Sequence, residues 1–198
     1  RLNVEAEIPN WDFEGVMKQA NTTWNEALGK IDIETSDNDS RTVFYTSLYH
    51  AFIQPSLASD VDGRYRTMGH EIKQDASYTN YTVFSLWDTF RAAHPLYTIV
   101  TPEQNQAFIR SLLRKYDEGG ILPKWELASN ETGTMIGYHA VSVIADAMMK
   151  KQCDFDVKKA LEACIRSSVY DTTGVTPMMD RQILNGKLMP VSIKYKNE

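Results

Sequence analysis

Apolar residues recur three and four positions apart along most of the chain, which is the spacing of one buried face of an α-helix. In residues 12–28 this pattern lies between Asp12, a residue type that caps helix N-termini, and Gly29, one that ends helices. Thr101-Pro102 gives the next clear helix a cap and a proline at its first position. The pattern predicts six helices, at 12–28, 43–52, 82–93, 101–116, 136–147 and about 154–170.

Connections of two kinds separate the predicted helices. Long polar segments alternate with shorter connections: the long ones are 56–81, 119–131 and 171 onward, and the short ones are 29–40, 95–101 and 149–153. If successive helices are antiparallel neighbours, all the long segments emerge at one end. No run alternates polar and apolar residues as a β-strand would. The pattern therefore predicts an all-α fold, a helical toroid with its long loops at one end.

Composition narrows the classes of function. The 198 residues carry 21 Lys and Arg against 26 Asp and Glu, and this net charge of −5 argues against binding nucleic acid by neutralising its phosphates. Apolar runs such as 141–149 are shorter than the ~20 residues that cross a bilayer, so no membrane span is predicted. Phosphate-loop, dinucleotide and serine-hydrolase motifs do not occur. The candidate chemistry therefore lies in the long loops.

The first candidate site is the segment 59–66, Ser-Asp-Val-Asp-Gly-Arg-Tyr-Arg. Asp60 and Asp62, followed by Arg64, present two carboxylates suited to a cation or to sugar hydroxyls. An Asx-type turn in which Gly63 takes a positive φ accounts for the same residues. An EF-hand is excluded because it needs a glutamate where this chain has Gly69.

A second candidate site lies within the predicted helix 82–93. Trp87 is either a core residue or a platform for a ligand. Asp88 and Arg91 are three positions apart and would share one helix face, where they form a salt bridge or line the rim of a site.

The third candidate site runs from Trp125 to His139 and includes Glu126, Asn130 and Glu131. A Trp ring stacks on the apolar face of a sugar, while carboxylates and amides bind its hydroxyls. The alternative is structural: Asn130 or Ser129 caps the following helix and Glu131 lies favourably in its first turn. Two spaced carboxylates are also what glycoside hydrolysis requires.

These segments, in this order, resemble glycoside hydrolase family 92, the calcium-dependent exo-α-mannosidases. The resemblance extends over essentially the whole chain. It rests on residues 11–13 (WDF), 24–28 (WNEAL), 49–52 (YHAF), 59–66 (SDVDGRYR), 81–95 (YTVFSLWDTFRAAHP), 122–127 (LPKWEL), 130–132 (NET) and 135–140 (MIGYHA).

The resemblance implies an inverting exo-α-mannosidase that removes terminal α-linked mannose, for example α-1,2-linked, from N-glycans or mannans. It also implies an (α/α)6 toroid behind an N-terminal β-sandwich, and secretion or a periplasmic location. Because family members are several times longer, residues 1–198 are expected to be the N-terminal half of the toroid, without the β-sandwich or the remaining helices. Half a toroid would leave apolar helix faces exposed.

The resemblance also implies which residues of the site bind the substrate and which support the pocket. The family's general acid and base lie in Glu-Gly-Asn and Asn-Glu-Asp motifs, and neither occurs here, so no catalytic residue is assigned. Asp60 and Asp62 are expected to contact mannose, with Arg64 on the same loop, and the other candidates to shape or support the pocket. Ca²⁺ is implied as cofactor, without an assigned ligand. The implied partners are α-mannoside glycans and the remaining segments of the same enzyme. A stand-alone helical carbohydrate-binding or interaction module is the alternative.

Overall fold

Helices dominate the computed structural model, which describes residues 1–169. The helix-rich character predicted from the sequence is therefore confirmed. The predicted long segment from residue 171 onward and the end of the sixth predicted helix lie outside the described residues. The helices are α1 (Leu2–Glu7), α2 (Phe13–Leu28), α3 (Asn38–Ile53), α4 (Leu86–Thr89), α5 (Ala93–Val100), α6 (Pro102–Gly119), α7 (His139–Met149) and α8 (Val157–Val169).

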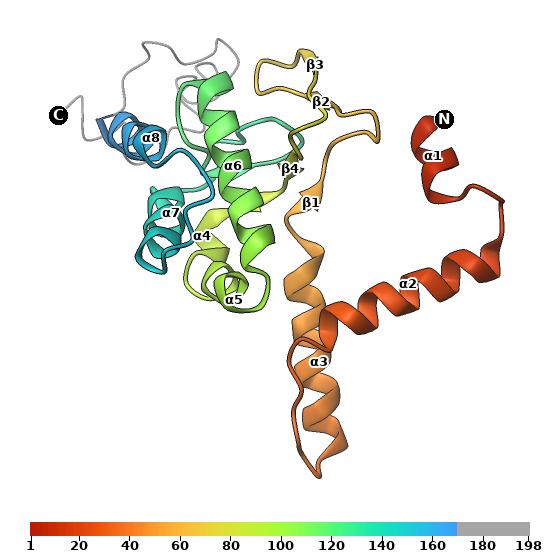
Figure 1. Cartoon of the computed structure of the whole chain (residues 1–198). Coiled ribbons are helices and arrows are strands. Elements are labelled where there is room, and N and C mark those ends of the chain that lie inside the picture. The colour runs from red at the N-terminus through yellow and green to blue at the C-terminus, as the bar shows by residue number, and fades with distance from the viewer. Residues whose placement is uncertain (170–198) are drawn as a thin grey trace.

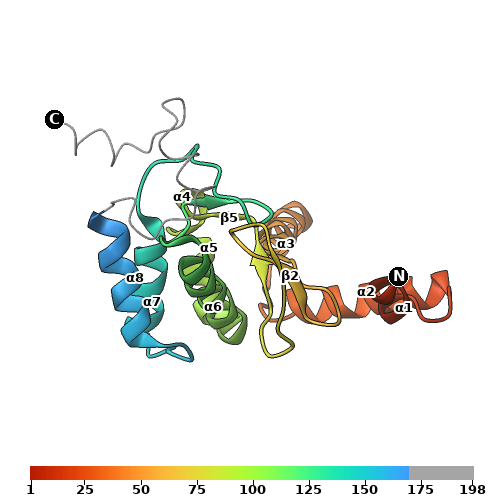
Figure 2. The same ribbon diagram turned by 90° about the horizontal axis from the view of Figure 1, so that it is seen from above.

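The described chain consists of a body and an arm. α4–α8 and the short strands form the body, while α2 and α3 extend away from its helices, and both views agree on this (Figures 1 and 2). Within the arm α2 packs against α3. The C-terminal end of α3 is fastened to the body, because the Tyr97 hydroxyl donates hydrogen bonds to the carbonyls of Ala51 (2.5 Å) and Gln54 (2.9 Å).

The core of the body surrounds α6. Ile109 and Leu112 are fully buried on this helix, and α5, α7 and α8 all pack against it. α6 begins with Pro102 and ends at Gly120, whose φ of 88° places it in the left-handed conformation that terminates helices. No helix among residues 1–169 combines the length and the apolar character needed to cross a membrane.

Three two-stranded antiparallel ladders lie in segments predicted to contain no strands. The pattern missed them because each strand has only two or three residues, too few for an alternating period to be visible. Their register pairs Ser56 with Thr82, Tyr65 with Lys73, and Ser85 with Trp125 in the respective ladders. The ladders are β1 (Ser56–Leu57) with β4 (Tyr81–Thr82), β2 (Arg64–Arg66) with β3 (Ile72–Gln74), and β5 (Phe84–Ser85) with β6 (Trp125–Glu126).

The predicted helix over 82–93 is wrong. That segment forms β5, part of β4 and the four-residue α4, and the helix α5 begins at Ala93, where the pattern predicted an end. Two local reasons are visible. Val83 has a φ of 66°, which an α-helix does not permit, and Pro95 lies in the first turn of α5, where a proline is tolerated. The predicted connection 95–101 is consequently mostly helix.

The other predicted helices are present, most of them with shifted ends. α2 has the predicted bounds, with Asp12 before it and Gly29 after it. α3 begins at Asn38, earlier than predicted, because the Asp37 carboxylate accepts hydrogen bonds from the amides of Asp39 and Ser40. α1 was not predicted, and it matters below because it contacts the first candidate site.

Candidate functional site

Segment 59–66, called the Asp60 hairpin from here on, forms a tight turn entering β2. The amide of Gly63, with φ 80°, donates to the carbonyl of Asp60 at 2.9 Å, and the amide of Asp60 donates to the carbonyl of Arg64 at 2.8 Å. Asp62 accepts from the Arg64 amide at 3.2 Å and from its guanidinium at 2.7 Å. Asp62 and Arg64 therefore satisfy one another, which agrees with the turn interpretation, and the exposed Asp60 is left as the carboxylate that can face a ligand.

The unpredicted helix α1 holds Asp60 in place. The Asn3 side-chain amide donates to Asp60 Oδ1 at 2.8 Å, and its oxygen accepts from the Val61 amide at 3.0 Å. Asp60, Asn3 and Glu7 line a cavity of about 260 Å³ between α1 and the hairpin. Sequence reasoning missed Asn3 because six residues give too short a pattern to reveal a helix, and 57 positions separate it from Asp60.

The second candidate site does not form the predicted helix face. Asp88 accepts a hydrogen bond from the Ser85 hydroxyl, and no ion pair joins Asp88 to Arg91 in the described structure. Arg91 instead lies 5.1 Å from the centre of the Phe90 ring. Trp87 is 42% exposed, so it is available as a platform for a ligand.

His139, on α7, contacts this second candidate site, which is called the Trp87 group (Trp87, Asp88, Arg91 and His139) from here on. Its ring stacks on Phe90 at 4.2 Å between centres, with planes 12° apart. Burial lowers the pKa of His139, and the nearby positive charge of Arg91 lowers it further. Both effects favour the neutral imidazole, which lies near the exposed Arg91.

Glu126 is fully buried and its carboxylate is occupied. It accepts hydrogen bonds from Lys115 Nζ (3.2 Å), the Thr82 hydroxyl (3.0 Å) and the Ser129 amide (2.5 Å). With an exposed fraction of 0%, it supports the loop that follows it and does not reach a ligand in this structure.

Glu131 is also buried, and its carboxylate is also occupied by hydrogen bonds. Its oxygens accept from the backbone amides of Lys124 (2.7 Å), Trp125 (3.3 Å) and Gly133 (3.0 Å). Burial raises its pKa, and these amides act in the opposite direction. A raised pKa suits a general acid, but a carboxyl that is 3% exposed and turned into its own loop cannot protonate a substrate. Trp125 and Asn130, on the same loop, are half-buried.

Two contacts connect these segments. The Ser129 hydroxyl donates to the Arg66 carbonyl at 2.6 Å, which ties the loop 125–133 to the Asp60 hairpin. The pairing of Ser85 with Trp125 places the Trp87 group beside the same loop. The structure therefore gathers the three predicted patches around loop 125–133, although no described hydrogen bond or ion pair joins Asp60 directly to the Trp87 group.

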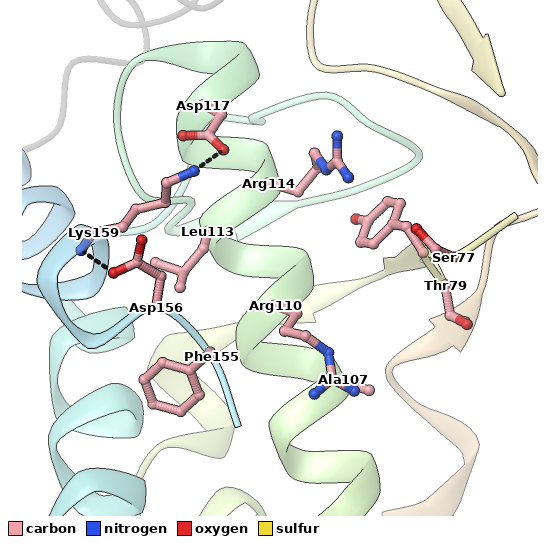
Figure 3. Close-up of a pocket in the computed structure, with 11 residues that line it drawn as sticks. Ser77, Thr79, Ala107, Arg110, Leu113, Arg114, Asp117, Phe155, Asp156 and Lys159 are labelled. Carbon is pink, nitrogen blue, oxygen red and sulfur yellow. Dashed lines mark hydrogen bonds and ion pairs between the residues drawn. The ribbon is translucent and has the colours of Figure 1, made fainter. Parts of the chain in front are cut away.

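Another pocket of about 420 Å³ lies along α6, between the loop 77–79 and the start of α8 (Figure 3). None of the eleven predicted site residues lines it. Its cationic side chains already have acidic partners: Arg114 pairs with Asp75 and Lys159 with Asp117, each at 2.7 Å.

The described residues do not provide the implied calcium site. Ca²⁺ takes six to eight oxygen ligands, several of them carboxylates. Within residues 1–169, no three His, Cys, Asp or Glu side chains gather closely enough to hold a metal ion. No chemical step proposed for these residues therefore involves the metal.

The three known proteins described next, to which this chain is similar, are all glycosidases. An uncharacterized secreted glycosidase of Arthroderma benhamiae is 29% identical over 172 residues, which are 84% of this chain and 18% of that protein. A solved family 92 α-mannosidase of Bacteroides thetaiotaomicron is 39% identical with a TM-score of 0.81, over 85% of this chain and 23% of the other. A family 92 inverting mannosidase of the same organism is 29% identical with a TM-score of 0.80, over 92% and 25%.

This chain thus spans about a fifth to a quarter of the length of the relatives it matches. The profile of the glycosyl hydrolase family 92 catalytic domain matches residues 1–189. The chain therefore belongs to the family defined by that catalytic domain.

Proposed function

We propose that this chain is part of an inverting exo-α-mannosidase that hydrolyses terminal α-linked mannose, for example α-1,2-linked, from N-glycans or mannans. Family membership supports the glycoside hydrolase class. The α-mannosidase and the inverting mannosidase of B. thetaiotaomicron support the substrate and the stereochemistry, and the former has also been solved with mannoimidazole.

Asp60 is the residue proposed to bind the sugar. Carboxylate oxygens accept hydrogen bonds from sugar hydroxyls, and Asp60 offers them at an exposed turn that lines a cavity. Asn3 fixes one of the two oxygens, so less side-chain freedom is lost when a sugar binds. This exposed and clamped carboxylate is the observation in the described residues that carries the proposal.

The catalytic acid and base are proposed to lie outside this chain. An inverting glycosidase needs two carboxyl groups about 6.5–9.5 Å apart with a water between one of them and the sugar. Glu126 and Glu131 cannot provide this pair, because both are buried and bonded to their own loop. Asp62 is paired with Arg64. The described residues thus bind and shape, and the proton transfers belong to other segments.

We further propose that residues 1–198 form the N-terminal half of an (α/α)6 toroid, completed by the remaining segments of a longer enzyme. The exposed apolar faces of α2 and α8 support this arrangement. Secretion or a periplasmic location is proposed on the strength of the secreted fungal relative.

The decisive measurement is mannose release from an aryl α-mannoside by the longer protein that contains this chain. Asp60→Ala is expected to lower kcat/KM about 10- to 100-fold, since a hydrogen bond to a charged group contributes about 1.5–3 kcal/mol. Asp117→Ala, which removes an exposed aspartate on the other side of α6, is the control and is expected to change kcat/KM less than threefold.

Two results would contradict the proposal. An unchanged kcat/KM in Asp60→Ala would remove Asp60 from the site. Release of mannose by the isolated 198-residue chain would show that the catalytic pair is present within it. Binding of mannan by the isolated chain, in a longer protein that hydrolyses no mannoside, would instead establish the alternative, a carbohydrate-binding module.

A further inference from the structure

Lys115 is a buried cation at the centre of the described fold. It lies on α6 and is 1% exposed, although an ammonium group is costly to remove from water. Burial lowers its pKa, while the negative charge of Glu126 acts in the opposite direction. Sequence reasoning did not single it out, because a lysine in a helix is ordinarily a surface residue. Such a group requires an explanation from its contacts.

On one side, Lys115 supports the loop 125–133. Its Nζ lies 3.2 Å from Glu126 Oε1, and the same carboxylate accepts from the Ser129 amide at 2.5 Å. Ala128 and Ser129 both have positive φ, 51° and 61°, a conformation that non-glycine residues rarely adopt. The hydrogen bonds to Glu126, and from the Ala128 amide to the Thr82 hydroxyl at 2.7 Å, therefore hold a loop that would otherwise relax.

On its other side, Lys115 reaches the Asp60 hairpin. Its Nζ lies 3.3 Å from Asn80 Oδ1, and Asn80 is 2% exposed. The backbone amide of Asn80 donates to the Ser59 hydroxyl at 2.7 Å, and the backbone carbonyl of Asn80 accepts from the Ala58 amide at 2.8 Å. Ser59 directly precedes Asp60, so only one residue, Asn80, stands between the lysine and the hairpin.

Lys115 thus lies between the two segments that the sequence marked as parts of one site. A buried ion pair is weak evidence for a gain in stability, because neutral side chains of similar volume often replace it at no cost. Lys115 is one cation that donates hydrogen bonds to both segments at once. The neutral side chains that replace an ion pair do not provide this connection. The contacts therefore favour a role in geometry.

We propose that Lys115 is a positioning residue, which fixes the Asp60 hairpin and the loop 125–133 relative to one another so that together they form the sugar-binding surface. It acts through Asn80 and Glu126 and does not touch the substrate. This inference rests on the proposed function for its activity, but the coupling of the two segments can be measured without any activity.

The first test is hydrogen exchange of backbone amides in the chain itself, comparing Lys115→Met with the wild type. The double variant Lys115→Met/Glu126→Gln is the alternative if the single variant does not fold, because it leaves no unpaired charge buried. We expect exchange at least tenfold faster both in the backbone contacts that fasten the hairpin (amides of Ala58 and Asn80) and in the loop (amides of Ala128 and Ser129). Faster exchange in one segment alone, or in neither, would overturn the proposal.

The matched control is Lys159→Met/Asp117→Asn, which removes an ion pair of 2.7 Å from the other side of α6. Exchange in both segments is expected to stay within twofold of the wild type. An equal acceleration in this control would show a general loosening of α6 and would overturn the proposal.

The second test is kinetic and uses the longer enzyme with an aryl α-mannoside. We expect kcat/KM to fall at least tenfold in the folded Lys115 variant, with a larger change in KM than in kcat, because the binding surface is displaced while the acid and base are untouched. A kcat/KM within twofold of the wild type would overturn the inference. A wild-type enzyme without mannosidase activity would overturn the proposed function instead, and the exchange result would still decide the role of Lys115.

Discussion

His94 shows how burial sets the charge of a single residue. It is 2% exposed, its ring packs edge-to-face against Tyr97 and Phe108, and its Nδ1 lies 3.3 Å from Asn105 Oδ1. Burial lowers its pKa to about 4, and the hydrogen bond to Asn105 acts in the opposite direction. His94 is therefore a packed residue of the core.

The pH dependence of stability follows from this shift. The unfolded chain binds a proton at His94 near pH 6.5, whereas the folded chain does not until about pH 4. The contribution of neutral His94 to the free energy of unfolding is therefore fully present above pH 6.5. It is lost as the pH falls towards 4, by about 3 kcal/mol in total. Urea unfolding at pH 7.5 and 4.5 measures this change.

His94→Gln isolates the contribution of this one group. Carboxylates common to both chains contribute equally, so the variant is expected to lose about 2–3 kcal/mol less than the wild type over the same pH interval. Equal losses in the two chains would mean that His94 is protonated in the folded state.

Among the elements, local signals predicted the ends of α2 and α6 well. Asp12 and Gly29 bound α2, and Pro102 and Gly120 bound α6, close to the predicted limits. The segment 82–93 failed because its apolar spacing is compatible with helix, while pairing with strands 26 and 40 positions away imposed extended structure. Non-local pairing of this kind overrides propensity and leaves no signal in the segment itself.

The faces of α6 and α8 are expected to respond differently to truncation. Leu112 on α6 is 0% exposed and Leu161 on α8 is 59% exposed. Leu112→Ala is expected to cost about 2–5 kcal/mol, since it leaves a cavity in the core. Leu161→Ala, the matched control, is expected to change stability by about 0.5 kcal/mol or less in this chain. Chemical denaturation of both variants tests this, and a comparable loss in Leu161→Ala would mean that α8 is covered.

At the largest scale, the described residues expose several large apolar side chains on helix faces. Trp11 and Phe13 at the start of α2 are 77% and 75% exposed, and Leu161, Ile165 and Val169 form an exposed stripe along α8. Exposed apolar helix faces were predicted for half a toroid, and the structure confirms the exposure. Surfaces of this kind mark interaction sites.

The stripe on α8 is expected to make the isolated chain self-associate as its concentration rises. Leu161→Lys/Ile165→Lys should shift sedimentation towards the monomer, because two charges then have to be desolvated on contact. Asn21→Lys/Asn25→Lys adds the same charge at exposed polar positions of α2 and should leave association unchanged. Equal effects of the two variants would point to net charge instead of the stripe.

The sequence by itself determined the helical class, the ends of α2 and α6 and the residue types from which a sugar-binding site can be made. Only the tertiary structure decided which of the candidate carboxylates face solvent. Asp60, Glu126 and Glu131 have the same functional group, yet Asp60 is exposed and the two glutamates are buried. Asp60 is paired with Asn3 and Glu126 with Lys115, while Glu131 is enclosed by the amides of its own loop. Burial is a property of the contacts around a side chain, and the spacing of residues along the chain does not encode it.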